Sequence, residues 1–145
     1  MKILVITILL SNMIKNKIFR QTFWFLFFIG ILNLFATYLY LYWTSWWFDL
    51  LMHFLGGFWV SMVILSFWSL FNKNSHKILS FYKTFIWVLI ISILWEIFEI
   101  WIGATMISDG VAFITDTISD LIMDIIGGIL GYLYGSSILR SNKNV

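Results

Sequence analysis

The sequence contains no cysteine and no proline, and only 11% of its 145 residues are charged. The absence of cysteine excludes a disulfide framework, a thiol nucleophile and a thiolate metal site. Hydrophobic residues, by contrast, make up 61% of the chain, and aromatic residues make up 21%. A soluble domain of this length could not bury so much apolar surface, and its remaining polar surface could not keep it in solution. The composition therefore predicts an integral membrane protein.

The length allows one compact helical unit, so we expect a single integral membrane domain over residues 1–145, with the lipid bilayer as its surroundings. The formal net charge of +2 at pH 7 is too small to indicate a nucleic-acid partner. The distribution of the charges along the chain is more informative than their sum.

Four apolar segments are long enough to cross a bilayer, which takes about 20 helical residues. We expect an all-α bundle of four membrane-spanning helices at residues 22–43, 48–71, 84–106 and 118–139. The apolar run at residues 3–10 is too short to span, and no small-residue cleavage site follows it. We therefore expect a short interfacial helix at the N-terminus.

With four spans, every Lys and Arg falls on one side of the membrane, the side of the two termini and of the loop at residues 72–83. These residues are Lys2, Lys15, Lys17, Arg20, Lys73, Lys77, Lys83, Arg140 and Lys143. The positive-inside rule then places both termini in the cytoplasm.

Carboxyl groups and one histidine lie inside the last three spans, at similar depth in the outer half of the membrane. They are Asp49 and His53 in the second span, Glu96 and Glu99 in the third, and Asp120 and Asp124 in the fourth. Residues three or four apart share one face of a helix, so each pair projects toward the same neighbour. No Lys or Arg lies within an expected span, so His53 is the one basic side chain available to these acids.

An ionised group at mid-membrane costs at least ~2.5–3.5 kcal/mol, so these residues should face the interior and have partners. One interpretation is a seam of hydrogen bonds between helices, with several carboxyl groups protonated. A second is a divalent metal ion, Mg²⁺, Mn²⁺ or Zn²⁺, bound by the carboxylates and His53. A third is a relay of protons or monovalent ions. Asp109 and Asp116 are interpreted as a solvated loop group and a helix-cap group.

Glycines continue the acidic face of the last span at four-residue intervals, at Gly127, Gly131 and Gly135. Small residues at this spacing let two helices approach closely, either within one chain or in a homo-oligomer. Asn33 and Thr37 in the first span are expected to form hydrogen bonds with a neighbouring helix.

Three motifs occur in order over residues 47–135. They are Asp49-x-x-x-His53-x-x-Gly56-Gly57, Glu96-x-x-Glu99, and Asp116-Thr117-x-x-Asp120-x-x-x-Asp124-x-x-Gly127-Gly128. In this order the motifs resemble those of the YjdF-type bacterial inner-membrane proteins, a group related to the VanZ-like family. The resemblance implies a multi-pass protein of the bacterial cytoplasmic membrane with undefined biochemistry, and a connection with the cell envelope.

Two functions follow from these observations. The first is a non-enzymatic envelope protein whose outward-facing cluster of acids and His53 binds a divalent cation or protons. The alternative is a membrane-embedded, metal-dependent enzyme that acts on a lipid-linked phosphate, with Glu99 or His53 activating water. An open cavity lined by these groups would favour the enzyme, and a filled polar seam would favour the first function.

Overall fold

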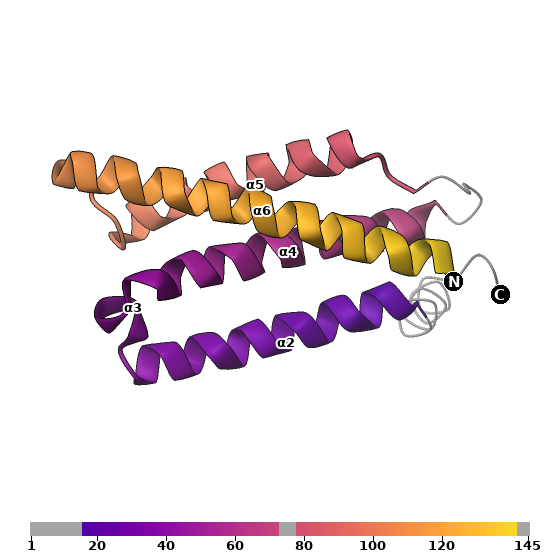
Figure 1. Ribbon diagram of the computed structural model, residues 1–145, viewed down its shortest axis with the longest axis horizontal. Helices are drawn as coiled ribbons and strands as arrows, with labels where there is room; N and C mark the ends of the chain where they lie inside the picture. Colours follow the sequence, from indigo (N-terminus) through magenta and orange to yellow (C-terminus); the bar gives the residue numbers. More distant parts are fainter. Residues whose placement is uncertain (1–15, 73–77, 142–145) are drawn as a thin grey trace, which may run out of the picture.

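The computed structural model describes residues 16–72 and 78–141, and all the regular structure in these residues is helical (Figure 1). Four of the helices are long and apolar enough to cross a membrane. They are α2 (Lys17–Tyr38), α4 (Trp46–Phe71), α5 (Phe81–Ile102) and α6 (Val111–Ser141). The short helix α3 (Leu41–Thr44) joins α2 to α4, and the 3-10 turn η1 (Ile107–Asp109) precedes α6. The predicted all-α membrane architecture is confirmed, whereas the expected N-terminal interfacial helix lies outside the described residues.

The helix bounds differ from the expected spans at both ends of the chain. Helix α2 begins at Lys17, where the side chain of Asn16 accepts a hydrogen bond from the backbone N–H of Ile18. It ends at Tyr38, before residue 43, because Tyr40 adopts a left-handed conformation with φ 56°. Helix α6 begins at Val111 and has 31 residues. At about 1.5 Å per residue it is longer than the ~30 Å hydrocarbon core, so part of it extends beyond that core.

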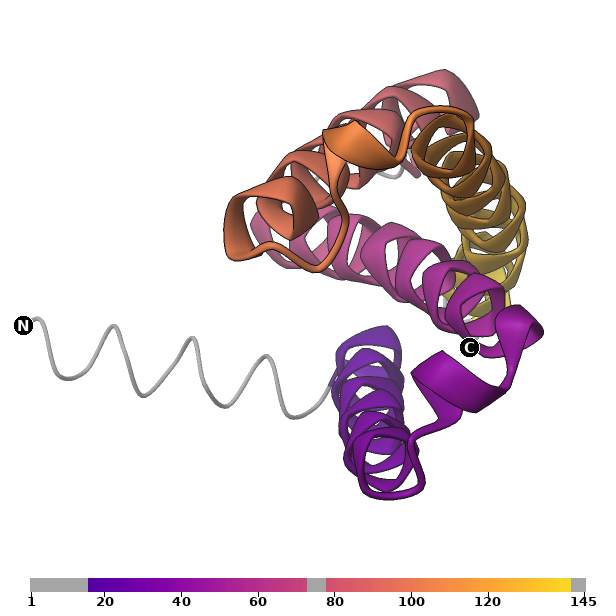
Figure 2. The ribbon, with the colours of Figure 1, turned by 90° about the vertical axis from the view of Figure 1, so that its left-hand side faces the viewer.

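Helix α4 is the central element of the bundle. It packs against α2 on one side and against α5 and α6 on the other, and α5 also packs against α6. Figure 2 shows α4, α5 and α6 as the three sides of a triangle, with α2 outside it against α4. The three helices that carry the predicted acids and histidine are therefore mutual neighbours.

The closest contact in the bundle, between α4 and α6, depends on glycine. A Cβ atom added to Gly57 would overlap the backbone of Asp124, and one added to Gly127 or Gly131 would overlap the backbone of Phe54 or Phe58. Gly135 continues this buried face of α6. Of the two roles expected for the ladder Gly127, Gly131 and Gly135, the structure shows the contact within the chain. The contacts of these three glycines in the structure are with α4 and with the side chains around Gly135, and the homo-oligomer stays a prediction.

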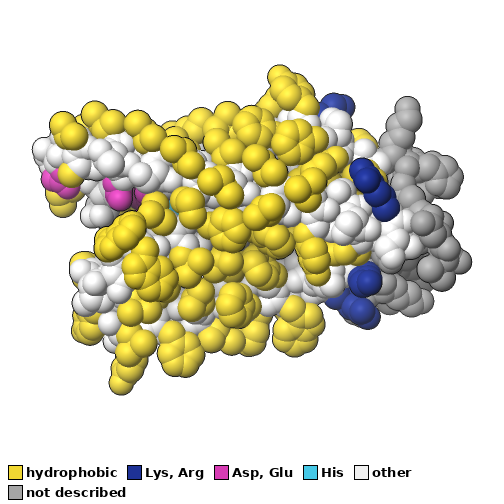
Figure 3. Space-filling model, viewed as in Figure 1, with side chains coloured by type: hydrophobic (Ala, Val, Ile, Leu, Met, Phe, Trp, Pro, Cys, Tyr) yellow, Lys and Arg dark blue, Asp and Glu magenta, His cyan; other side chains and the backbone are white. Residues whose placement is uncertain are grey.

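Charge and apolar packing divide the molecule into two ends. All the described Lys and Arg residues lie at one end and the Asp and Glu side chains lie toward the other, with an apolar surface between them (Figure 3). The apolar core lies toward the basic end and consists of Ile18, Met62, Leu65, Leu79, Ile138 and Leu139. Many large apolar side chains on all four long helices remain exposed, as a bilayer environment requires. The polar cluster therefore occupies the end of the bundle that this core leaves free.

Candidate metal centre

The six predicted site residues come together because their helices begin or end at the same end of the bundle. Asp49 and His53 lie in the first turns of α4, and Glu96 and Glu99 lie in the last turns of α5. Asp120 and Asp124 lie in α6 at the level of His53. The side chain of His53 is the common neighbour of the three helices.

Each nitrogen of the His53 ring faces different carboxylates. Nδ1 lies 3.4 Å from Oδ2 of Asp124. Nε2 lies 3.9 Å from Oδ1 of Asp120 and 4.0 Å from Oε1 of Glu99. The ring therefore separates Asp124 from the other two carboxylates.

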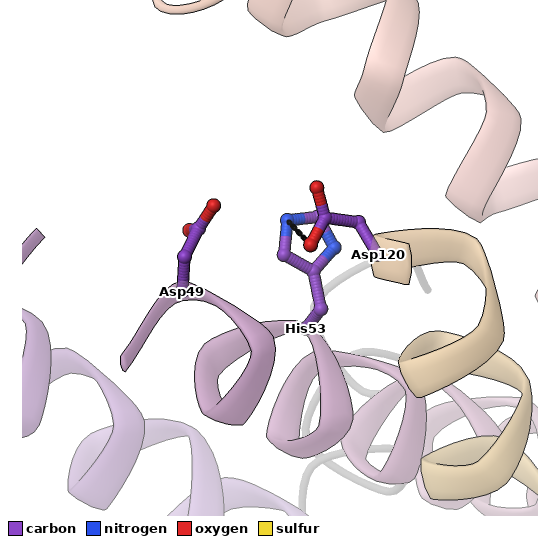
Figure 4. A group of neighbouring side chains, drawn as sticks. All are labelled: Asp49, His53 and Asp120. Carbon is purple, nitrogen blue, oxygen red and sulfur yellow. Dashed lines mark ion pairs between the residues drawn. The ribbon is translucent and has the colours of Figure 1, made fainter. Parts of the chain in front are cut away.

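Two groups of side chains offer ligand atoms that all lie within 4.8 Å of one another. The first consists of Asp49, His53 and Asp120, which approach one another from α4 and α6 (Figure 4). The second consists of His53, Glu96 and Glu99. His53 belongs to both groups. The structure thus gathers all the predicted site residues around one imidazole, and their role as metal ligands stays a prediction.

Burial increases from Asp49 and Glu99 toward the interior. The side chain of Glu99 is 15% exposed, and Asp49 is half-buried. His53, Glu96, Asp120 and Asp124 are all buried, and Asp120 is only 1% exposed. Asp49 and Glu99 therefore form the outer edge of the cluster.

Two buried carboxylate oxygens have no hydrogen-bond partner within residues 16–72 and 78–141. They are Oε1 of Glu96 and Oδ1 of Asp120. A buried polar atom without a partner costs about 1–3 kcal/mol, and a charged one costs more. Oδ1 of Asp120 is also the atom that faces Nε2 of His53. Asp120 and Glu96 are both members of the groups described above. The side chain of Thr117 lies near Glu96 and can serve as its partner. A bound cation would supply the interaction that Oδ1 of Asp120 lacks.

Among residues 16–72 and 78–141, the one basic side chain beside these carboxyl groups is that of His53. The described Lys and Arg residues (Lys17, Arg20, Lys83 and Arg140) lie at the opposite end of the bundle. Five carboxyl groups therefore surround one imidazole, and full ionisation would leave an excess of negative charge in a low-dielectric interior.

Two residues that the sequence analysis missed support the outer edge of the cluster. The indole Nε1 of Trp95 donates a hydrogen bond to Oε1 of Glu99 at 2.9 Å. Trp95 precedes Glu99 by four residues on one helix, and this spacing could have indicated the contact. Tyr42, in the link before α4, has its pKa raised to about 12 by burial and by the charges of Asp49 and Glu99. No local sequence pattern indicates that Tyr42 lies beside these acids.

The remaining polar predictions have mixed outcomes. Asp109 and Asp116 are exposed, as expected, but Asp116 lies inside α6 and is not a cap, because that helix begins at Val111. Asn33 accepts a hydrogen bond from the Tyr42 hydroxyl at 2.7 Å. The prediction that Thr37 bonds to a neighbouring helix is wrong, because its hydroxyl donates a hydrogen bond to the backbone carbonyl of Asn33 within α2.

Comparison with known proteins identifies a family without assigning an activity. The family model described as "Predicted membrane protein (DUF2238)" matches residues 1–141. No curated protein and no solved structure matches the chain. A proposal about function therefore depends on the geometry around His53.

Proposed function

The chain belongs to the DUF2238 family of predicted membrane proteins, and we propose that this member binds one divalent cation at Nε2 of His53. Carboxylate oxygens from the two groups around His53, those of Asp49, Asp120, Glu96 and Glu99, complete the site. The observation that carries the proposal is Oδ1 of Asp120, which is buried without a hydrogen-bond partner in the described chain and faces Nε2.

The distances support a site that closes on an ion through small side-chain movements. Two atoms that bind one ion at about 2.0–2.2 Å lie no more than ~4.4 Å apart. Nε2 of His53 lies 3.9 Å from Asp120 and 4.0 Å from Glu99, both within that limit. Since both carboxylates approach the same nitrogen, one ion per chain is the expected stoichiometry.

The donor atoms restrict the class of metal. Carboxylate oxygens suit Mg²⁺, Ca²⁺ and Mn²⁺, whereas imidazole suits Zn²⁺ and the later transition metals. A site with one imidazole among carboxylates favours Mn²⁺ or Zn²⁺ over Mg²⁺ and Ca²⁺.

Access to the site is from one side. The apolar core of Ile18, Met62, Leu65, Leu79, Ile138 and Leu139 lies toward the basic end, away from the cluster. Asp49 and Glu99, the least buried members of the cluster, lie on the acidic side. This arrangement supports a binding site reached from the acidic end, and not a continuous path across the membrane.

We place the protein in the bacterial cytoplasmic membrane with its basic end in the cytoplasm and the cation site facing the envelope. The segregation of the described basic residues to one end supports this orientation. The resemblance of the three motifs to those of YjdF-type bacterial inner-membrane proteins supports the bacterial location.

Cation binding is better supported than an enzyme that acts on a lipid-linked phosphate. In a metal-dependent enzyme the bound ion would supply part of the positive charge that a phosphate group needs, and the rest would have to come from Lys or Arg side chains. Among the described residues, the acidic end offers no Lys or Arg for this purpose, and a phosphate there would meet carboxylates on three helices. The geometry therefore supports a site for a cation.

The test is thermal unfolding in detergent after treatment with a chelator, followed by addition of Mn²⁺, Zn²⁺, Mg²⁺ or Ca²⁺. An ion that binds only the folded protein stabilises it by about 2.7 kcal/mol at one hundred times its Kd. We expect Mn²⁺ or Zn²⁺ to raise the Tm of the wild type and of the exposed-acid control Asp116→Asn, but not that of His53→Ala. If none of the four ions raises the Tm of the wild type, the proposal is wrong.

A further inference from the structure

Resting on this cation site, we propose that Asp124 is a positioning residue and not a ligand. Its carboxylate holds the proton on Nδ1 of His53, which leaves the lone pair of Nε2 for the ion. Of the six residues that the sequence indicated as ligands, Asp124 thus acts on the ion through His53.

The two nitrogens of His53 face different partners. Asp124 approaches Nδ1, whereas Asp120 and Glu99 approach Nε2. Asp124 is a member of neither group of converging ligand atoms. An ion bound to Nε2 between Asp120 and Glu99 lies on the far side of the ring from Asp124.

The chemistry of metal-bound histidine explains why such a partner is needed. A neutral imidazole carries one proton, and the nitrogen that keeps it cannot bind a metal. Histidine ligands usually donate the other N–H to a carboxylate or carbonyl, and loss of that partner typically weakens metal binding by about 10–100-fold. The Nδ1 to Oδ2 distance of 3.4 Å exceeds the ~2.7–3.2 Å of a typical N–H···O bond. An ion on Nε2 makes the Nδ1–H group a stronger donor, so metal binding should shorten this distance.

Backbone packing fixes Asp124 relative to His53. Gly57 follows His53 by one turn of α4, and its Cα lies directly against the backbone of Asp124. At the neighbouring Gly56, an added Cβ atom would lie 3.8 Å from Oδ1 of Asp124, which is an ordinary contact distance. The contact with Gly57 thus fixes the backbone of Asp124 relative to His53, and Oδ2 of its side chain lies next to Nδ1.

The decisive measurement is nitrogen NMR of ¹⁵N-histidine-labelled protein with and without Zn²⁺. The chain contains two histidines, so a His76→Gln background leaves His53 as the single labelled residue. The chemical shifts of the two ring nitrogens identify which one carries the proton and which one binds the metal. With Asp124 intact, we expect the Zn²⁺-dependent shift at Nε2 and the proton on Nδ1.

Two variants separate a positioning role from a ligand role. Asp124→Asn should still bind one Zn²⁺ per chain, with affinity reduced by about 10–100-fold. Asp120→Asn, which removes a direct ligand, should lose more affinity than Asp124→Asn.

A Zn²⁺-dependent shift at Nδ1 in the wild type, or a greater loss in Asp124→Asn than in Asp120→Asn, would overturn the positioning role and leave the cation site intact. No response of either nitrogen to Zn²⁺, and no broadening of either signal by paramagnetic Mn²⁺, would overturn the cation site and this inference together. The NMR result needs no variant of Asp124, so it stands even if Asp124→Asn does not fold.

Discussion

Gly57 of α4 lies against the backbone of Asp124 in α6, so closely that a Cβ atom at residue 57 would overlap the Asp124 carbonyl group. The same crossing places Asp124 beside Nδ1 of His53, one turn earlier in α4. The polar cluster therefore depends on the close packing of these two helices. A change that separates α4 from α6 should both destabilise the fold and disrupt the cluster.

Gly57→Ala tests this connection. The added methyl group meets backbone atoms, which cannot move aside as a flexible side chain can. We expect the free energy of unfolding in detergent to fall by at least about 1–3 kcal/mol, the usual cost of overpacking a core. We also expect weaker Zn²⁺ or Mn²⁺ binding, because the separation of α4 and α6 moves His53 away from Asp120.

Gly56→Ala is the matched control, since it adds the same methyl group one residue earlier in the same helix. The nearest atom to its Cβ would be Oδ1 of Asp124 at 3.8 Å, an ordinary contact. Replacing glycine by alanine inside a helix is favourable by about 0.8–1.0 kcal/mol. Gly56→Ala should therefore be neutral or stabilising, and equal loss of stability in both variants would contradict the packing argument.

The sequence predicted the membrane fold well because the bilayer directly requires long apolar segments and favours basic residues on one side. Helix bounds were harder to predict. The fourth span was expected to begin at residue 118 with Asp116 as its cap, but α6 begins at Val111 and includes the polar residues Thr115, Asp116 and Thr117. The end of α2 depends on the left-handed backbone of Tyr40, a conformation that residues other than glycine seldom adopt.

The composition of the candidate site was predictable, whereas its internal arrangement was not. The spacing of these residues along each helix and their matched depth on three helices were enough to predict that Asp49, Asp120 and Glu99 lie close to His53. Which acid faces which ring nitrogen depends on the rotation of α4 against α6, and backbone contact at Gly57 sets that rotation. Sequence spacing carries no information about rotation between helices that are distant in the chain.

Tyr42→Phe should show a dependence on pH that arises from one hydroxyl group. The Tyr42 hydroxyl donates a hydrogen bond to Asn33, which links α3 to α2. A bond of this kind contributes about 0.5–1.5 kcal/mol. Burial first, and then Asp49 and Glu99, raise the Tyr42 pKa from 10.0 to about 12.

Because the folded-state pKa of Tyr42 is raised, its contribution to stability is fully present below pH 10 and is lost as the pH rises toward 12. The difference in unfolding free energy between wild type and Tyr42→Phe should therefore be constant from pH 7 to about pH 9.5 and decrease above it. Denaturant titrations of both proteins across this range provide the measurement. A difference that increased above pH 10 would show that the charged phenolate is the favoured form.

Orientation in the membrane can be measured by cysteine labelling, since the natural chain has no cysteine to remove. Ser108 and Lys83 are exposed near opposite ends of the bundle. In intact cells, a membrane-impermeant maleimide should label Ser108→Cys and not Lys83→Cys, and after cell lysis it should label both. Labelling of Lys83→Cys alone in intact cells would show the opposite orientation, with the cation site facing the cytoplasm.

Asp120→Asn distinguishes a cation site from a seam of protonated carboxyl groups. Without metal, the substitution removes a buried group that lacks a hydrogen-bond partner on Oδ1 in the described chain and, if ionised, carries a costly charge. We therefore expect the Tm of Asp120→Asn in chelator to equal or exceed that of the wild type. With saturating Mn²⁺ or Zn²⁺ the order should reverse, because only the wild type gains the binding free energy. Asp116→Asn, which changes an exposed acid on the same helix, should follow the wild type in both conditions. If Asp120→Asn stayed at or above the wild-type Tm with every ion, the carboxyl group would serve only as a neutral partner in the seam.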